Sequence, residues 1–132
     1  MRLTADTNIL VRAAADDDPR QSPAARRLLS EVELIAVPVP VLCEFVWVMA
    51  RGYGKPPAEI VRAIRSLIAA GPVRTDVPAV EAGLAFLEAG GDFADGVIAF
   101  QGRQLGAETF ASFDRNALDL VRAGGGEAVE PS

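Results

Sequence analysis

Short apolar segments alternate with helical segments along the whole sequence, and this alternation limits the chain to few folds. The clearest apolar segment is 34–37, a continuous run of the kind that forms a strand buried on both faces. The clearest helix is 57–70, where Ile60, Ile64 and Leu67 recur along one face. Strands that alternate with helices predict an α/β fold, in which helices cover both faces of a parallel sheet.

The other segments are predicted from the same patterns and from the positions of proline and glycine. Further strands are expected at 2–5, 73–76, 109–113 and 128–130. Further helices are expected at 7–15, 22–32, 40–51, 78–89, 92–105 and 115–123, and Ser22-Pro23 has the order of an N-cap and first turn. No repeat or linker is present, so one domain, residues 1–132, is expected around a central sheet of four to five strands.

The residue types exclude several kinds of catalysis. The chain has no histidine, which removes Ser-His-Asp, Cys-His and imidazole–zinc chemistry. Its one cysteine, Cys43, excludes an internal disulfide and lies in an apolar run, where a buried and inert thiol is expected. Catalysis would then depend on carboxylates, hydroxyls, arginine, Lys55 or an oxygen-bound metal, and carboxylate sites prefer hard cations such as Mg²⁺ and Mn²⁺.

The net charge of −5 argues against a protein that passively coats nucleic acid, because such proteins are usually basic. An enzyme that contacts a few phosphates through a metal is less constrained. No segment has the form of a signal peptide, and the apolar stretch 34–50 contains two prolines and Glu44 and is too short to span a bilayer. We therefore expect a cytoplasmic protein without a membrane partner.

Acidic residues fall at the transitions from predicted strands to predicted helices, where the sites of parallel α/β sheets lie. They are Asp6, Glu44, Asp95 and Asp114, with Asp92 one turn before Asp95. Structural roles are open for each, since Asp6, Asp92 and Asp114 could be N-caps and Asp95 could complement a helix dipole. Carboxylates gathered without a counter-charge repel one another, so a cluster of them predicts a bound divalent cation.

Glu44 is the only charged residue between Leu34 and Ala50. A carboxylate on so apolar a helix is costly to bury without a partner. A lysine or arginine elsewhere in the chain and a shared cation are both open as that partner.

Four blocks of the sequence resemble the signature motifs of PIN-domain nucleases: DTNIL at 6–10, Glu44 in an apolar helix, GDFADGVIA at 91–99, and SFDR at 112–115. Their order and spacing cover the whole chain and are similar to those of VapC-type toxins of VapBC toxin–antitoxin modules. The resemblance implies one PIN domain with a three-layer α/β/α fold.

Carried over to this sequence, the resemblance implies that Asp6, Glu44, Asp95 and Asp114 are the catalytic residues and hold the metal. Asp92 is a further metal-ligand candidate, and Asn8, Ser112 and Asn116 are expected to support the site. Many relatives have an acid at the position of Asn116 and an aromatic residue at that of Ala117. The amide adds no negative charge, so weaker affinity for a second cation is expected.

The resemblance further implies an Mg²⁺- or Mn²⁺-dependent endoribonuclease that leaves a 5′-phosphate and a 3′-hydroxyl. The expected partners are RNA, a second copy of the chain in a homodimer, and a cognate antitoxin in a hetero-oligomer. The tail of the antitoxin would occupy the acidic groove. The candidates for contacts with RNA phosphates are Arg12, Arg51, Lys55, Arg103 and Arg115.

Three other functions remain open from the sequence. One is a stand-alone PIN nuclease of RNA processing, and another is a catalytically silent interaction module on the same fold. The third is a phosphatase of the haloacid-dehalogenase kind with Asp6 as nucleophile. Such enzymes need a second acid two residues later, where this chain has Asn8, and a suitably placed lysine, for which only Lys55 is available.

Overall fold

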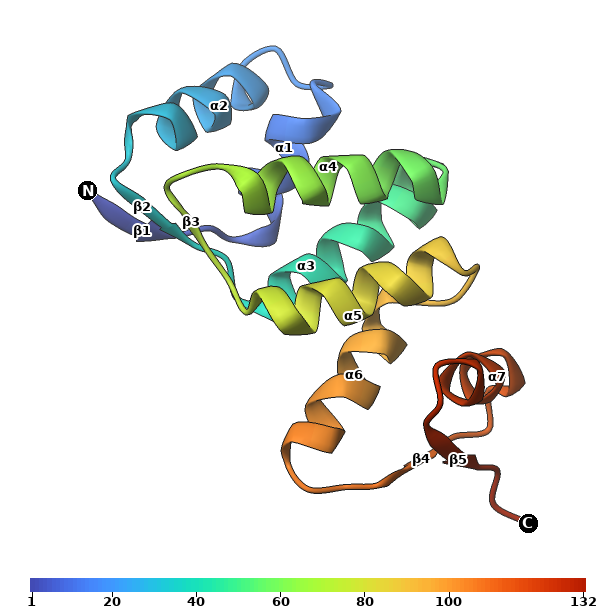
Figure 1. The fold of residues 1–132 in the computed structure, drawn as a ribbon. Coiled ribbons are helices and arrows are strands. Elements are labelled where there is room, and N and C mark those ends of the chain that lie inside the picture. The colour runs from blue at the N-terminus through green and yellow to red at the C-terminus, as the bar shows by residue number, and fades with distance from the viewer. The chain divides into compact units, whose positions relative to one another are not determined.

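Five short strands and seven α-helices make up the chain, which a computed structural model describes over all residues, 1–132 (Figure 1). The chain divides into two units, Met1–Val77 and Pro78–Ser132. None of the helices is both long enough and apolar enough to cross a membrane.

The first unit is built on a parallel sheet of three strands in the order β1-β2-β3. In this sheet Leu3 pairs with Ile35, and Ile35 pairs with Val73. Its core consists of apolar side chains from the strands and helices, including Val37, Leu42, Ile60 and Ile64. The elements are β1 (Arg2–Thr4), α1 (Thr7–Ala15), α2 (Gln21–Glu31), β2 (Leu34–Ala36), α3 (Val39–Trp47), α4 (Pro57–Ala69) and β3 (Val73–Arg74).

The second helix begins one residue earlier than predicted, and Ser22 is not its N-cap. Ser22 lies fully buried in the first turn. Arg20 holds the N-cap position, and Oδ1 of Asp18, two residues earlier, accepts from the backbone N–H groups of Arg20 and Gln21 at 2.9 and 2.7 Å. These two hydrogen bonds lower the pKa of Asp18 below its usual value.

The helix predicted at 40–51 also differs from a regular α-helix. After α3 the chain continues as a π-helix, η1 (Val48–Gly52), in which the N–H of Tyr53 donates to the carbonyl of Val48. A π turn contains one more residue than an α turn, so it shifts all later residues around the helix axis. Hydrophobic spacing in the sequence does not reveal such an insertion.

The second unit contains three helices and a two-stranded parallel sheet. Phe93 is completely buried and packs so closely on Gly83 that a Cβ at residue 83 would lie 2.7 Å from its ring. Gly96 similarly lies against the backbone of Ala82. The elements are α5 (Val77–Glu88), α6 (Phe93–Gln104), β4 (Thr109–Ala111), α7 (Arg115–Ala123) and β5 (Glu127–Val129).

The α/β class, the parallel strands and the number of strands are confirmed. The five strands form two hydrogen-bonded sheets, of three and two strands, where the sequence predicts one. The assignment of all 132 residues to one domain stays a prediction.

Candidate active site

Asp6 and Glu44 both belong to the first unit, and Thr7, the first residue of α1, forms a hydrogen bond with each of them. Asp6 is the N-cap of α1, and its Oδ1 accepts from the backbone N–H of Thr7 at 2.8 Å. The hydroxyl of Thr7 donates to Oε2 of Glu44 at 2.9 Å, across 37 positions of sequence. Thr7 therefore contacts two of the four predicted catalytic acids, Asp6 through its backbone N–H and Glu44 through its hydroxyl.

Glu44 is exposed rather than buried. The neighbours that make its sequence segment apolar, Leu42, Phe45 and Val46, face the core, whereas Trp47 is 62% exposed. The α3 helix therefore has a solvent-facing side that carries Glu44, and the expected cost of burying this carboxylate does not arise. Its partner within the unit is the Thr7 hydroxyl and not a lysine or arginine.

Asp92, Asp95 and Asp114 belong to the second unit. Asp92 caps α6 by accepting from the N–H of Ala94 at 3.3 Å, and Asp114 caps α7 by accepting from the N–H of Ala117 at 3.1 Å. The structural roles considered for Asp6, Asp92 and Asp114 are thus all present. Capping uses only part of the hydrogen-bonding capacity of a carboxylate, so it is compatible with a ligand on the remaining oxygen.

Asp95 differs from the other acids of the second unit because it is half-buried in the first turn of α6. Burial raises the pKa of its carboxyl above the usual value, and the negative charges of Asp92 and Asp114 raise it further. The charges of Asp92 and Asp114 therefore act on the Asp95 carboxyl within this unit.

The polar residues predicted to support the site have different roles. Ser112 accepts from the backbone N–H of Asp114 through its Oγ at 3.0 Å, which fixes the turn that leads into α7. The side-chain amide of Asn116 donates to the carbonyl of Gly90 at 3.1 Å and so ties α7 to the turn before Asp92. Asn8 is exposed and lines a groove between α1 and α2.

The donor chemistry of these residues fits a hard divalent cation. All four predicted ligands offer carboxylate oxygens, and within its own unit none of them forms an ion pair with lysine or arginine. Within either unit, no group of three or more metal-ligating side chains lies close enough to hold one ion. The convergence of Asp6, Glu44, Asp95 and Asp114 on one cation thus stays a prediction.

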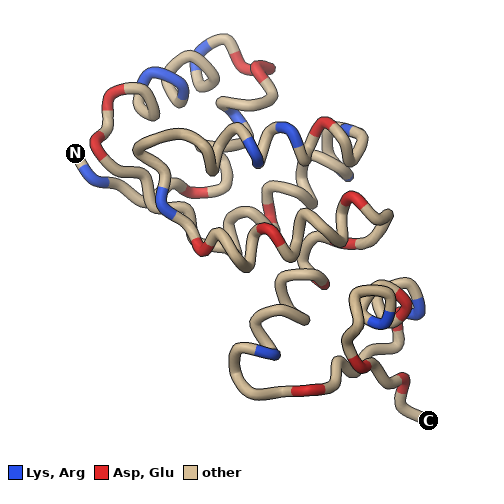
Figure 2. Tube along the Cα trace, in the orientation of Figure 1, with Lys and Arg blue, Asp and Glu red and all other residues tan.

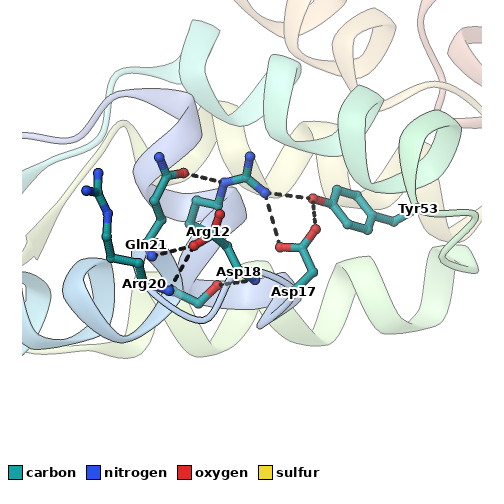
Figure 3. A network of polar contacts seen from close by, with 7 residues as sticks. Arg12, Asp17, Asp18, Arg20, Gln21 and Tyr53 are labelled. Carbon is teal, nitrogen blue, oxygen red and sulfur yellow. Dashed lines mark hydrogen bonds and ion pairs between the residues drawn. The ribbon is translucent and has the colours of Figure 1, made fainter.

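Arg12, a predicted phosphate contact, lies in a polar network of the first unit (Figure 3). Its guanidinium pairs with Asp17 at 3.2 Å and donates to the Gln21 side chain at 2.8 Å. The hydroxyl of Tyr53 donates to Asp17 at 2.6 Å, and this bond is the main cause of a lowered pKa for Asp17. Arg12 thus joins α1 to the loop before α2 and to the end of η1.

The other predicted phosphate contacts lie at exposed positions of both units, among the basic residues marked in Figure 2. Lys55 lies 3.9 Å from Glu59, and Arg115 lies 3.8 Å from Glu130. Arg51 lies in the last turn of η1, and Arg103 borders an apolar hollow of about 380 Å³ in the second unit. A role for any of them in RNA binding stays a prediction.

Thr7 is the residue of this region that the sequence interpretation missed. It is only 6% exposed, although threonine is a polar residue and stands directly after an N-cap. Its hydrogen bond to Glu44 depends on how α1 and α3 pack together, so no local pattern reveals it. Its position between Asp6 and Asn8 in the first motif is the one sequence signal that draws attention to it.

Comparisons with known proteins give a family for the chain. A comparison with curated proteins found no match. A solved structure of VapC20 from Mycobacterium tuberculosis, described as a sarcin–ricin loop cleaving toxin, is similar with 20% identity and a TM-score of 0.45, over 98% of this chain and 99% of that one. The family model of the PIN domain matches residues 4–123, which include parts of both units and all four predicted catalytic acids. The chain therefore belongs to the PIN domain family.

Proposed function

We propose that this PIN domain is a metal-dependent endoribonuclease and the toxin of a type II toxin–antitoxin pair. Membership of the family supports the nuclease class. The observation that carries the proposal is that Asp6, Glu44, Asp95 and Asp114 form no ion pair with a basic residue within their units. Such carboxylates suit Mg²⁺ or Mn²⁺.

The proposed reaction is hydrolysis of an RNA phosphodiester. A bound divalent cation would supply Lewis acidity towards the scissile phosphate and would lower the pKa of a water. The carboxylates of the chain would hold that cation, and one of them would accept a proton from the attacking water. The chain has no histidine that could do so.

The toxin role is supported by the resemblance of the four motifs, in order and spacing, to VapC-type proteins. The expected antitoxin would present a basic segment, because the chain carries a net charge of −5 and exposed carboxylates. RNA, an antitoxin and a second copy of the chain are the proposed partners.

Cleavage of RNA by the purified protein tests the activity. RNA is incubated with Mg²⁺, with Mn²⁺ and with EDTA, and the parent chain is compared with Asp6→Asn, Glu44→Gln and Asp114→Asn. Asp119→Asn is the matched control, because Asp119 is an exposed acid of the same helix as Asp114 and lies 3.8 Å from Arg122. Each of the three variants is expected to cleave RNA at least 100-fold more slowly than the parent chain. A loss of about 3 kcal/mol of transition-state stabilisation produces a decrease of this size.

Cleavage that persists in EDTA would refute the metal dependence, and equal loss in Asp119→Asn would refute the assignment of the site. The toxin role is tested separately by expression in a bacterial host. Growth arrest that needs Glu44, and that the product of an adjacent small reading frame relieves, is the expected result. A host that grows normally while the purified protein cleaves RNA would point to a stand-alone nuclease.

A further inference from the structure

Thr7 makes two hydrogen bonds to two acids of the proposed site, one from its backbone and one from its side chain. The backbone N–H donates to Oδ1 of Asp6 at 2.8 Å, and the hydroxyl donates to Oε2 of Glu44 at 2.9 Å. The two carboxylates come from different elements, since Asp6 precedes α1 and Glu44 lies within α3. Thr7 thus connects the two acids: it follows Asp6 directly in the chain, and its hydroxyl is bonded to Glu44.

The two partners of the hydroxyl bond differ in mobility. The Thr7 side chain is buried and has one rotatable χ angle, so its hydroxyl is fixed by the packing around it. Glu44 is exposed on α3, and a glutamate in that position has several rotamers. A bond from the fixed hydroxyl restricts the mobile carboxylate to few orientations, and it occupies Oε2 while leaving Oε1 available.

We propose that Thr7 is a positioning residue that pre-orients Glu44 as a cation ligand beside Asp6. This inference rests on the proposed function, because it assigns Glu44 a role in holding the cation. Ligands held in place by hydrogen-bonded neighbours bind metal more tightly, and loss of such a neighbour typically lowers metal affinity about 10- to 100-fold. The alternative is that the bond only fastens α1 to α3.

Two substitutions at residue 7 separate these roles. Thr7→Val keeps the shape of the side chain and removes the hydroxyl, whereas Thr7→Ser keeps the hydroxyl and removes a buried methyl group. The dissociation constant for Mn²⁺ is measured without RNA by titration calorimetry or electron paramagnetic resonance, and the melting temperature is measured without metal. If Thr7 orients Glu44, Thr7→Val binds Mn²⁺ about 10-fold more weakly, and Thr7→Ser binds it like the parent chain.

A double-mutant cycle with Glu44→Gln ties the effect to this pair. Thr7→Val is expected to weaken Mn²⁺ binding in the parent and to have no further effect in the Glu44→Gln background. Two results would show that Thr7 acts through the fold alone. One is that Thr7→Val weakens Mn²⁺ binding in both backgrounds. The other is that Thr7→Ser and Thr7→Val weaken Mn²⁺ binding equally and also lower the melting temperature. Should Thr7→Val fail to fold, Thr7→Ala takes its place in the cycle with Glu44→Gln, because it also removes the hydroxyl. An affinity for Mn²⁺ equal to that of Thr7→Ser would then overturn the proposal.

The same measurements distinguish failure of this inference from failure of the proposed function. If Glu44→Gln abolishes RNA cleavage and weakens Mn²⁺ binding while Thr7→Val behaves like the parent, only the role of Thr7 is refuted. If Glu44→Gln binds Mn²⁺ as the parent does, the metal site itself is refuted.

Discussion

The contact between α5 and α6 makes Gly96→Ala a sharp test of the structure next to Asp95. A Cβ at residue 96 would lie 2.5 Å from the carbonyl oxygen of Ala82, 2.9 Å from the ring of Phe86 and 3.0 Å from the Cα of Gly83. The carbonyl oxygen of Ala82 and the Cα of Gly83 belong to the backbone of α5. Backbone atoms of a helix cannot change position as easily as the end of a flexible side chain. The two helices must therefore move apart to admit one methyl group.

The expected cost follows from two opposed effects. Overpacking of a tight contact costs about 1–3 kcal/mol, and the backbone clash places this site near the upper value. Alanine is preferred over glycine in a helix by about 1 kcal/mol, which leaves a net loss of about 2 kcal/mol. At about 4 °C per kcal/mol for a chain of this length, the melting temperature should fall by about 8 °C.

Thermal unfolding followed by circular dichroism measures this change. Gly102→Ala is the matched control, since Gly102 lies on the same helix and nothing lies within 4 Å of the added Cβ. The control should melt at the parent temperature or slightly above it, because only the helix preference acts there. Equal melting temperatures for the two variants would refute the close approach of α5 and α6. RNA cleavage should fall in Gly96→Ala alone, because this residue follows Asp95.

Two further predictions concern charge in the second unit. Asp95→Asn should raise the melting temperature of the metal-free protein at pH 7, because the raised pKa means that ionised Asp95 destabilises the folded state. This destabilisation is absent below the usual pKa of 3.8 and grows as the pH rises through the pKa of the folded state. The melting curves of Asp95→Asn and the parent chain should therefore coincide at pH 3. Asn116→Asp should lower the melting temperature, because a carboxylate cannot donate to the carbonyl of Gly90 and the lost hydrogen bond is worth about 1 kcal/mol. The same variant should bind Mn²⁺ more tightly in a calorimetric titration, because it adds a negative charge.

Much of the fold could be predicted because proline and glycine bound its elements. The helix expected at 115–123 has those bounds in the structure, and the helix expected at 57–70 differs by one residue. The errors arise where one local signal competes with another. Ser22-Pro23 has the form of a helix start, yet the helix begins at Gln21, and Oδ1 of Asp18 accepts from the N–H groups of Arg20 and Gln21.

The candidate site could be predicted only as far as local sequence determines it. Asp6, Asp92 and Asp114 stand where chains leave strands or turns to begin helices, and their positions follow from that pattern. The bond from Thr7 to Glu44 and that from Asn116 to Gly90 join residues 37 and 26 positions apart. Such bonds depend on how helices pack, which is a property of the fold and not of any short segment.

The pairing of Arg12, Lys55 and Arg115 with acids of the chain has a consequence for ionic strength. A basic protein that binds RNA releases one condensed counterion for nearly every phosphate it neutralises, so its affinity falls steeply as salt is added. Here each of these cations would break an intramolecular ion pair when it contacts a phosphate, and added salt weakens that ion pair as well as the contact with RNA. Binding of RNA to this chain should therefore change much less between dilute buffer and the salt concentration of a cell than binding to a basic protein does.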